Sequence, residues 1–165
     1  MRTRLRWVMG GVILAGCIYA GAVHATPASQ FTGTTVALGH FDEFDVSLHT
    51  IPADIWQSQQ RTVGQSDVYV QSNVWQPGGT TGWHSHPGHS LIIVTAGTVT
   101  DYEGDDPSCT PHVYTVGQGF VDGGGDHVHM IRNEGSVEAR TYAVQLIPAG
   151  AVRRIDKPHP DNCPF

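Results

Sequence analysis

The sequence is poor in basic residues and lacks the short motifs of several large enzyme classes. Of its 165 residues, nine are Lys or Arg, against 15 Asp or Glu. This acidic balance argues against the basic patches that bind nucleic acid or anionic membrane surfaces. Beyond residue 25 the chain has no P-loop, no dinucleotide-binding glycine fingerprint and no G-x-S-x-G motif. These absences argue against P-loop NTPases, Rossmann-type enzymes and serine hydrolases of the G-x-S-x-G type.

The N-terminus has the pattern of a secretory signal peptide. Arg2, Arg4 and Arg6 precede the apolar run VMGGVILAGCIYAGAV, and VHA ends at Ala25 with small residues at the two positions that a signal peptidase reads. The apolar run is short for a spanning helix, which needs about 20 residues. We therefore expect residues 1–25 to be removed and the protein to be secreted or periplasmic. The remaining chain keeps six basic and all 15 acidic residues, a net charge of −9.

Cysteine is scarce, with Cys17, Cys109 and Cys163 only. Cys17 closes the segment LAGC, which matches the box after which bacterial lipoproteins are cut and lipidated. A lipoprotein anchored at Cys17 is therefore the alternative, although the apolar IYAGAV that follows favours cleavage after Ala25. Cleavage there leaves Cys109 and Cys163, and two cysteines in an exported chain predict one disulfide. Closing a loop of about 55 residues would contribute about 4 kcal/mol to stability.

Short runs of β-branched and aromatic residues, separated by Gly, Pro, Asn and Asp, predict strands along the chain. Only residues 52–61 tolerate a helix, and weakly. The pattern predicts an all-β fold, either a barrel or a double-sheet jelly roll, with residues 26–165 as a single domain. The expected strands are 34–41, 67–75, 90–96, 97–103, 112–116, 127–133 and 138–147.

Histidines are concentrated in two segments. In GWHSHPGHSL, His84 and His86 are two residues apart on an extended segment, so both point to the same face. His127 and His129 repeat this spacing after the turn DGGGD. In a small barrel that face can be the interior, where imidazoles bind iron, zinc, copper, nickel or manganese. The pattern predicts one divalent transition metal, and the alternative is a set of hydrogen-bonded strand histidines.

Both segments resemble the two motifs of the cupin family. GGTTGWHSHPGHSLIIVTAG, from Gly78 to Gly97, is similar to the first motif, and GQGFVDGGGDHVHMIRN is similar to the second. The resemblance covers about residues 68–147 and is to the small single-domain cupins of the type-2 group. It implies a cupin jelly-roll β-barrel, a double-stranded β-helix, with one metal in its mouth. His84, His86 and His129 fall on the ligand positions.

Two departures from the motifs change the expected site. Ser90 stands where the family usually has a glutamate ligand, so we expect three histidines plus waters, which leaves coordination positions open. His89 is an alternative fourth ligand, although strand alternation points it away if Ser90 faces inward. Gly123 or Gly124 stands where the second motif usually has proline. A centre without the carboxylate keeps more positive charge and favours an anionic or chelating ligand.

The resemblance leaves two classes of function open. One is a metal-dependent enzyme, dioxygenase-like, on a small oxyacid, phenolic or similar chelating substrate; isomerase or lyase chemistry would use the same ligands. His127 and His89 are then the candidate catalytic residues. The alternative is a non-catalytic module that binds a small ligand or the metal.

A homodimer is a further expectation, and no stable membrane insertion is expected after signal cleavage. The acidic segment 101–106, with Glu103, is expected to be a solvated loop, and Asp122 and Asp126 are expected to be turn residues.

Overall fold

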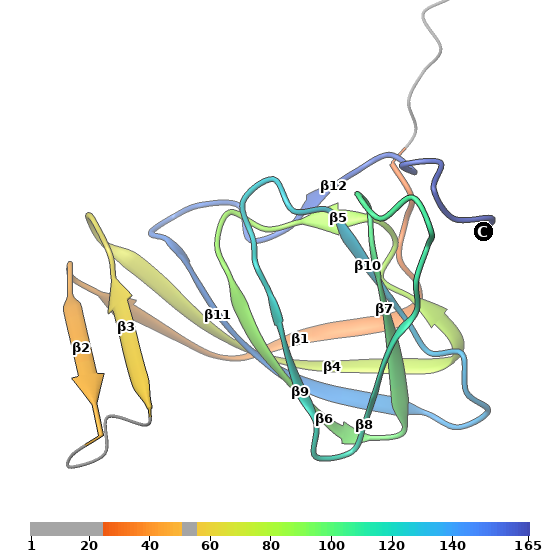
Figure 1. The fold of residues 1–165 in the computed structure, drawn as a ribbon, viewed down its shortest axis with the longest axis horizontal. Coiled ribbons are helices and arrows are strands. Elements are labelled where there is room, and N and C mark those ends of the chain that lie inside the picture. Colours follow the sequence, from red (N-terminus) through yellow and green to blue (C-terminus); the bar gives the residue numbers. More distant parts are fainter. Residues whose placement is uncertain (1–24, 51–55) are drawn as a thin grey trace, which may run out of the picture.

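The computed structural model describes residues 25–50 and 56–165, and every regular element in this part of the chain is a strand (Figure 1). The expected signal peptide and the alternative lipidation site at Cys17 fall on residues 1–24, outside the described residues. They stay predictions. In the described residues no helix is long and apolar enough to cross a membrane.

Twelve strands make up the fold of the described residues. In chain order they are β1 (Ser29–Phe41), β2 (Asp45–His49), β3 (Gln57–Arg61), β4 (Ser66–Thr80), β5 (His84–Ser85), β6 (Ser90–Ala96), β7 (Thr98–Glu103), β8 (His112–Thr115), β9 (Gly119–Asp122), β10 (His129–Arg132), β11 (Ala139–Pro148) and β12 (Ile155–Asp156).

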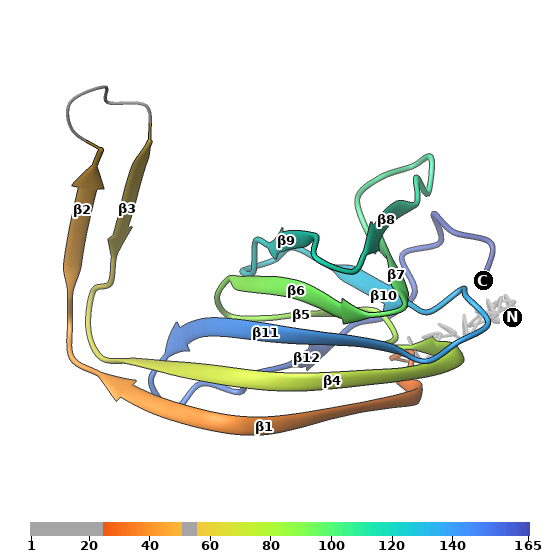
Figure 2. The same ribbon diagram turned by 90° about the horizontal axis from the view of Figure 1, so that it is seen from below.

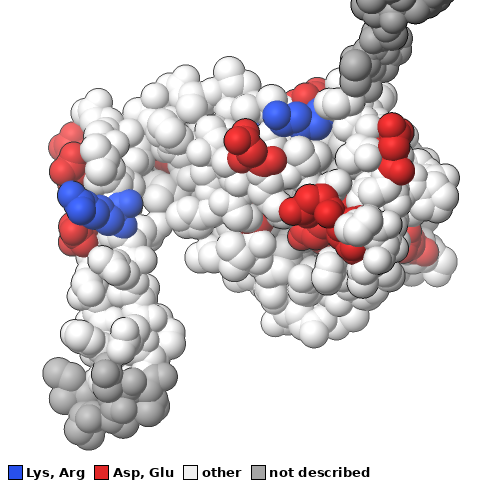
Figure 3. Space-filling model, turned by 45° about the horizontal axis from the view of Figure 1, so that its top comes forward, with Lys and Arg blue, Asp and Glu red and all other residues white. Residues whose placement is uncertain are grey.

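Ten of these strands form one antiparallel sheet that curls into a nearly closed barrel (Figure 1). The order is β12-β5-β10-β4-β11-β6-β9, with β1 on β4 and with β7 joining β10 to β8. Strand β4 is the longest and lies between β1 and β11. The all-β jelly-roll prediction is confirmed. Figure 3 shows acidic side chains in several groups on the visible face of the barrel, with few basic ones among them.

Strand alternation creates the core. In β6, Ser90, Ile92 and Val94 are buried, while the residues between them are exposed, as the sequence predicts. Ile92 and Val94 join a buried cluster in which Trp75 and Phe120 are the largest side chains. Burying side chains of this size contributes about 1.5–3 kcal/mol each. This cluster fills part of the barrel and leaves a polar cavity beside it.

A second buried cluster lies around Trp83, with Tyr102, Met130 and Cys163. Cys163 is bonded to Cys109, so the predicted disulfide is present. It ties the chain end to the loop between β7 and β8. The cluster therefore packs the reverse side of the segment that carries His84.

Some elements differ from the sequence predictions. Residues 57–61, expected as the end of a weak helix, form strand β3, because they pair with β2 in a separate hairpin. Figure 2 shows that this hairpin stands away from the barrel. Strand β9 was expected as turn and motif sequence, and it forms because it pairs with β6. The strand expected over 127–133 begins only at His129.

We predict that the double variant Cys109→Ser/Cys163→Ser loses about 4 kcal/mol of unfolding free energy, because the disulfide closes a loop of 54 residues. Urea unfolding followed by tryptophan fluorescence measures this loss. Wild-type protein reduced with dithiothreitol is the control and should unfold at the same midpoint as the variant. Equal midpoints for oxidised and reduced wild type would contradict the prediction.

Candidate metal centre

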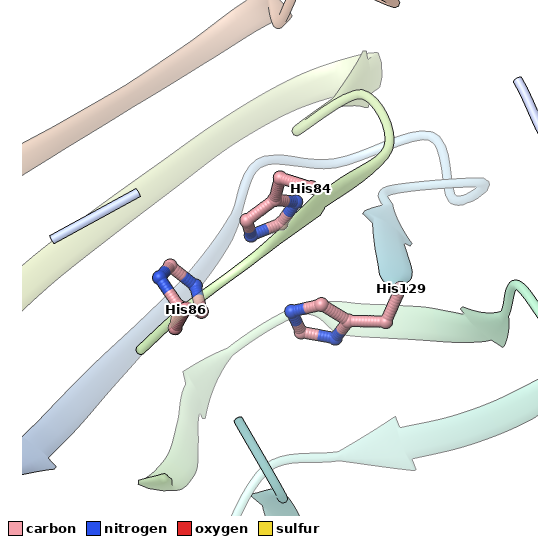
Figure 4. A group of neighbouring side chains, drawn as sticks. All are labelled: His84, His86 and His129. Carbon is pink, nitrogen blue, oxygen red and sulfur yellow. The ribbon is translucent and has the colours of Figure 1, made fainter. Parts of the chain in front are cut away.

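Three histidines converge inside the barrel (Figure 4). His84 lies in β5, His86 follows that strand directly, and His129 begins β10. Because β5 and β10 are antiparallel neighbours, His84 and His129 are paired across the two strands. One nitrogen from each ring lies within 4.8 Å of the others. All three residues are buried, with at most 6% of their surface exposed.

Each imidazole is oriented by a hydrogen bond at Nδ1. The Nδ1–H of His84 donates to the carbonyl of Gly82 at 2.9 Å, and that of His86 donates to the carbonyl of Arg153 at 2.6 Å. The Nδ1–H of His129 donates to Oδ1 of Asp101 at 3.1 Å. Fixing the proton on Nδ1 leaves Nε2 of each ring free to bind a metal, as in most histidine metal sites.

The polar atoms of the site fit a metal ion. Nε2 of His129 is fully buried and has no hydrogen-bond partner in the part of the chain that the structure describes. Leaving a buried polar atom unsatisfied costs about 1–3 kcal/mol. A cation bound between the three rings would satisfy this nitrogen and its two neighbours together. Imidazole donors suit zinc, iron, copper, nickel and manganese, so the donor set does not select one element.

Burial sets the charge state of two of the rings. Desolvation, followed by the charge of His129, lowers the pKa of His84 well below its usual value. Desolvation lowers the pKa of His86 to about 4. Both rings are therefore neutral at pH 7, with lone pairs available to a metal. Burial also acts to lower the pKa of His129, but the hydrogen bond and charge of Asp101, with the charge of Asp122, raise it overall.

Two carboxylates beside the site were misread from the sequence. Asp101, expected in a solvated loop, is 3% exposed and lies in β7, which pairs with β10. Asp122, expected as a turn residue, does accept a hydrogen bond from the backbone N–H of Gly124 at 3.0 Å. It is also only 1% exposed and faces the imidazoles. Had a strand been predicted over 119–122, alternation would have placed Asp122 inward with Phe120.

Ser90 faces the interior, as strand alternation predicts. Its hydroxyl donates to Oδ2 of Asp122 at 3.3 Å and accepts from Nε2 of Gln145 at 3.2 Å. A steric constraint explains why position 124 is a glycine. Its φ is +67°, and an added Cβ would lie 2.3 Å from the carbonyl of Gly88. The turns that carry the two histidine segments therefore touch backbone to backbone.

The two candidate catalytic histidines lie in different places. His127 sits at the edge of the site, where Nε2 contacts Oε2 of Glu103 and Nδ1 is 3.5 Å from Oδ1 of Asp122. Glu103 is thus a half-buried partner of His127 and not a solvated residue. His89 instead lines an outer groove beside strand β3 and contacts Gln60 at 3.4 Å. The structure does not bring His89 to the three-histidine group.

A cavity of about 50 Å³ adjoins the three histidines. One water needs about 10–15 Å³ by this measure, so the space holds about four waters. Amide and hydroxyl side chains of β4 and β11 line it, among them Gln71 and Gln145. The half-buried Arg153 also lines it, and within residues 25–50 and 56–165 no ion pair joins Arg153 to a carboxylate. No sequence pattern indicated Arg153, because this residue follows the predicted motifs and reaches the site only through the fold.

No family model matches the chain, and no curated protein matches its sequence. Similar solved structures include an oxalate oxidase, with 22% identity, a TM-score of 0.42 and 50% of this chain covered. The match spans 46% of the oxalate oxidase, about half its length. A cupin superfamily protein from Desulfitobacterium hafniense has 13% identity and a TM-score of 0.42, covering 65% of this chain and 81% of that one.

A third similar structure is a sugar phosphate isomerase from a cupin superfamily, from Silicibacter pomeroyi. It has 20% identity and a TM-score of 0.41, covering 47% of this chain and 49% of that one. Two of these three structures carry the name of the family that the sequence resembles. With every identity below 25% and every TM-score below 0.5, these likenesses say nothing about the activity of this chain.

We predict that His129→Ala abolishes stoichiometric metal binding, because it removes the most deeply buried of the three donors. His89→Ala is the matched control and should keep wild-type metal content. Metal is measured by mass spectrometry on folded protein purified without chelators or a His-tag. Equal metal content in His129→Ala and the wild type would contradict the assignment.

Asp101→Asn tests the hydrogen bond behind His129. The change removes the charge that orients this ring, and loss of such a partner weakens metal affinity by about 10–100-fold. Titration with Zn²⁺ against a competing chelator measures the affinity. An affinity within twofold of wild type would show that Asp101 does not support the ligand.

Proposed function

We propose that the protein is a cupin-type, metal-dependent enzyme that acts on a small anionic chelating molecule, with a short oxyacid as the favoured substrate class. The observation that carries the proposal is the buried three-histidine cluster, with Nε2 of His129 lacking a partner, beside a polar cavity. The type-2 cupin assignment rests on the motif resemblance.

His84, His86 and His129 would hold one divalent transition metal. When bound, such an ion supplies Lewis acidity and, if it is iron, manganese or copper, a redox centre. The chain's own contribution is to keep His84 and His86 neutral, and to orient all three rings and shield them from bulk water. A dioxygenase-like reaction is the leading hypothesis, and isomerase or lyase chemistry would need the same ligands.

Cavity size and charge favour a short oxyacid over a phenol or a sugar. A space for about four waters fits a ligand with few non-hydrogen atoms. The guanidinium of Arg153 presents the planar fork that binds a carboxylate in two places. Oε1 of Gln145 is buried without a hydrogen-bond donor, and it could accept one from a substrate hydroxyl.

His127 is our candidate for proton transfer. It lies at the edge of the site between Glu103 and Asp122, and it remains partly exposed, with 28% of its side chain accessible. A proton could pass along these groups between solvent and the cavity. His89 has no such position, so it has no part in the proposal.

The second candidate function is a binding module without turnover. It is favoured by one observation: within the described residues, the cavity wall holds no histidine beyond the three proposed ligands. Such a protein would bind the metal and a small anion and convert neither. Oxygen consumption or product formation separates the two functions.

We also propose that the protein is exported and forms a homodimer. A disulfide is typical of oxidising compartments, which supports export. Exposed apolar side chains on the outer face of β6 and β9, Leu91, Ile93 and Val121, support self-association.

We predict that metal-loaded protein binds two- and three-carbon oxyacids and rejects catechol. Arg153→Gln should weaken oxyacid binding at least about tenfold, because a charge-assisted hydrogen bond contributes about 1.5–3 kcal/mol. Arg140→Gln is the control, since Arg140 is exposed and pairs with Glu138. Calorimetry measures binding, and an oxygen electrode with product NMR measures turnover.

Three results would separate the hypotheses. Metal-dependent conversion of an oxyacid supports the enzyme, and binding without conversion supports the module. Tighter binding of catechol, or unchanged oxyacid affinity in Arg153→Gln, would contradict the assigned substrate class.

A further inference from the structure

We infer that Asp122, supplied by strand β9, is a direct fourth ligand of the proposed metal. The inference rests on the proposed three-histidine site and goes beyond it, because that site was expected to lack a protein carboxylate. It follows from the burial of Asp122, from its distances to two imidazoles and from its pairing with Ser90.

The carboxylate of Asp122 is buried and incompletely paired. It is 1% exposed, and a charge at such a position is costly unless it is hydrogen-bonded and balanced by another charge. Its hydrogen bonds come from the hydroxyl of Ser90, from the backbone N–H of Gly124 and, at 3.5 Å from Oδ1, from the ring Nδ1 of His127. A cation on the cavity side would balance the charge.

The free side of Oδ2 faces two of the three imidazoles. It lies 3.8 Å from Nε2 of His86 and 3.9 Å from Nε2 of His129. These distances are too long for hydrogen bonds. With metal–ligand bonds of about 2.0–2.2 Å, neighbouring ligand atoms are separated by about 3.0–3.5 Å. The observed gaps exceed that spacing by a few tenths of an ångström, so a small inward movement would complete the coordination.

Strand pairing explains why an aspartate at this position can reach the centre. Ser90 in β6 and Asp122 in β9 are directly paired across the two antiparallel strands. Both side chains therefore project into the barrel from neighbouring positions. The Ser90 hydroxyl, itself held by Gln145, donates to Oδ2 and steers the carboxylate. The cupin motif usually has a glutamate at the position of Ser90. In this chain the carboxylate is on the neighbouring strand, at the paired position 122.

The decisive experiment compares Mn²⁺ and Co²⁺ binding in three variants. Asp122→Asn removes the charge and keeps the shape. Asp126→Asn is the matched control, because Asp126 lies on the same turn and is exposed. Ser90→Glu/Asp122→Ser returns a carboxylate to the paired position on β6. Calorimetry gives the affinities at one pH, and the visible absorption of Co²⁺ reports the coordination.

We expect Asp122→Asn to lose about 100-fold or more in affinity, beyond the range for residues that only support a ligand. Its Co²⁺ spectrum should change as well. Asp126→Asn should stay within twofold of wild type, and the exchange variant should recover most of the lost affinity. A loss under tenfold in Asp122→Asn, with an unchanged Co²⁺ spectrum, would overturn the inference.

A measurement on the wild type covers the case in which Asp122→Asn does not fold. Protein labelled with ¹³C at the aspartate carboxyls and loaded with Mn²⁺ should show a strong ¹³C hyperfine coupling by pulsed EPR. Absence of that coupling in metal-loaded protein would overturn the role of Asp122 and leave the three-histidine site intact. Failure of the wild type to take up any metal would instead overturn the proposed function, and the inference with it.

Discussion

Three buried imidazole rings face one another inside the barrel, and the surrounding residues are arranged to orient and shield them. Each ring is almost entirely buried, and each uses Nδ1 in a hydrogen bond to the protein. The Nε2 atoms are therefore directed at a common space, and that of His129 has no hydrogen-bond partner among the described residues. An arrangement of this kind is costly without a partner and favourable around a cation.

The fold supplies the support for these rings from distant parts of the chain. The ring of His129 is held by Asp101, 28 residues away, and that of His86 by the carbonyl of Arg153, 67 residues away. Trp83 and its cluster fix the reverse side of the segment that carries His84. The disulfide fixes the tail on the same cluster. Stability of the barrel and geometry of the site are thus linked, because the segment that buries Trp83 in the core also carries His84.

The sequence was sufficient to predict the features that depend on a local residue pattern. Alternation placed β6 with its observed bounds, and it placed Ser90 on the inner face. The H-x-H spacing indicated His84 and His86, and the motif resemblance indicated His129. The two remaining cysteines indicated the disulfide. In each case neighbouring residues or a count were enough.

What could not be predicted depends on pairing between strands far apart in sequence. Asp122 reads as a turn residue until β9 is known to pair with β6. Asp101 falls within the predicted strand 97–103, but its burial follows only once β7 is known to pair with β10. Arg153 lies beyond the motifs and reaches the cavity only because the chain returns to β5 through β12. Strand β3 has a polar sequence and lies within residues 52–61, which gave a weak helical signal.

The proposed function depends on the binding of one metal ion by the three histidines. The most direct test is anomalous X-ray diffraction at the absorption edge of the bound metal, from crystals of protein purified without chelators. We expect a single strong peak at about 2.0–2.2 Å from Nε2 of His84, His86 and His129. Crystals of metal-supplemented protein with no peak among these three rings, or with peaks at the surface only, would contradict it.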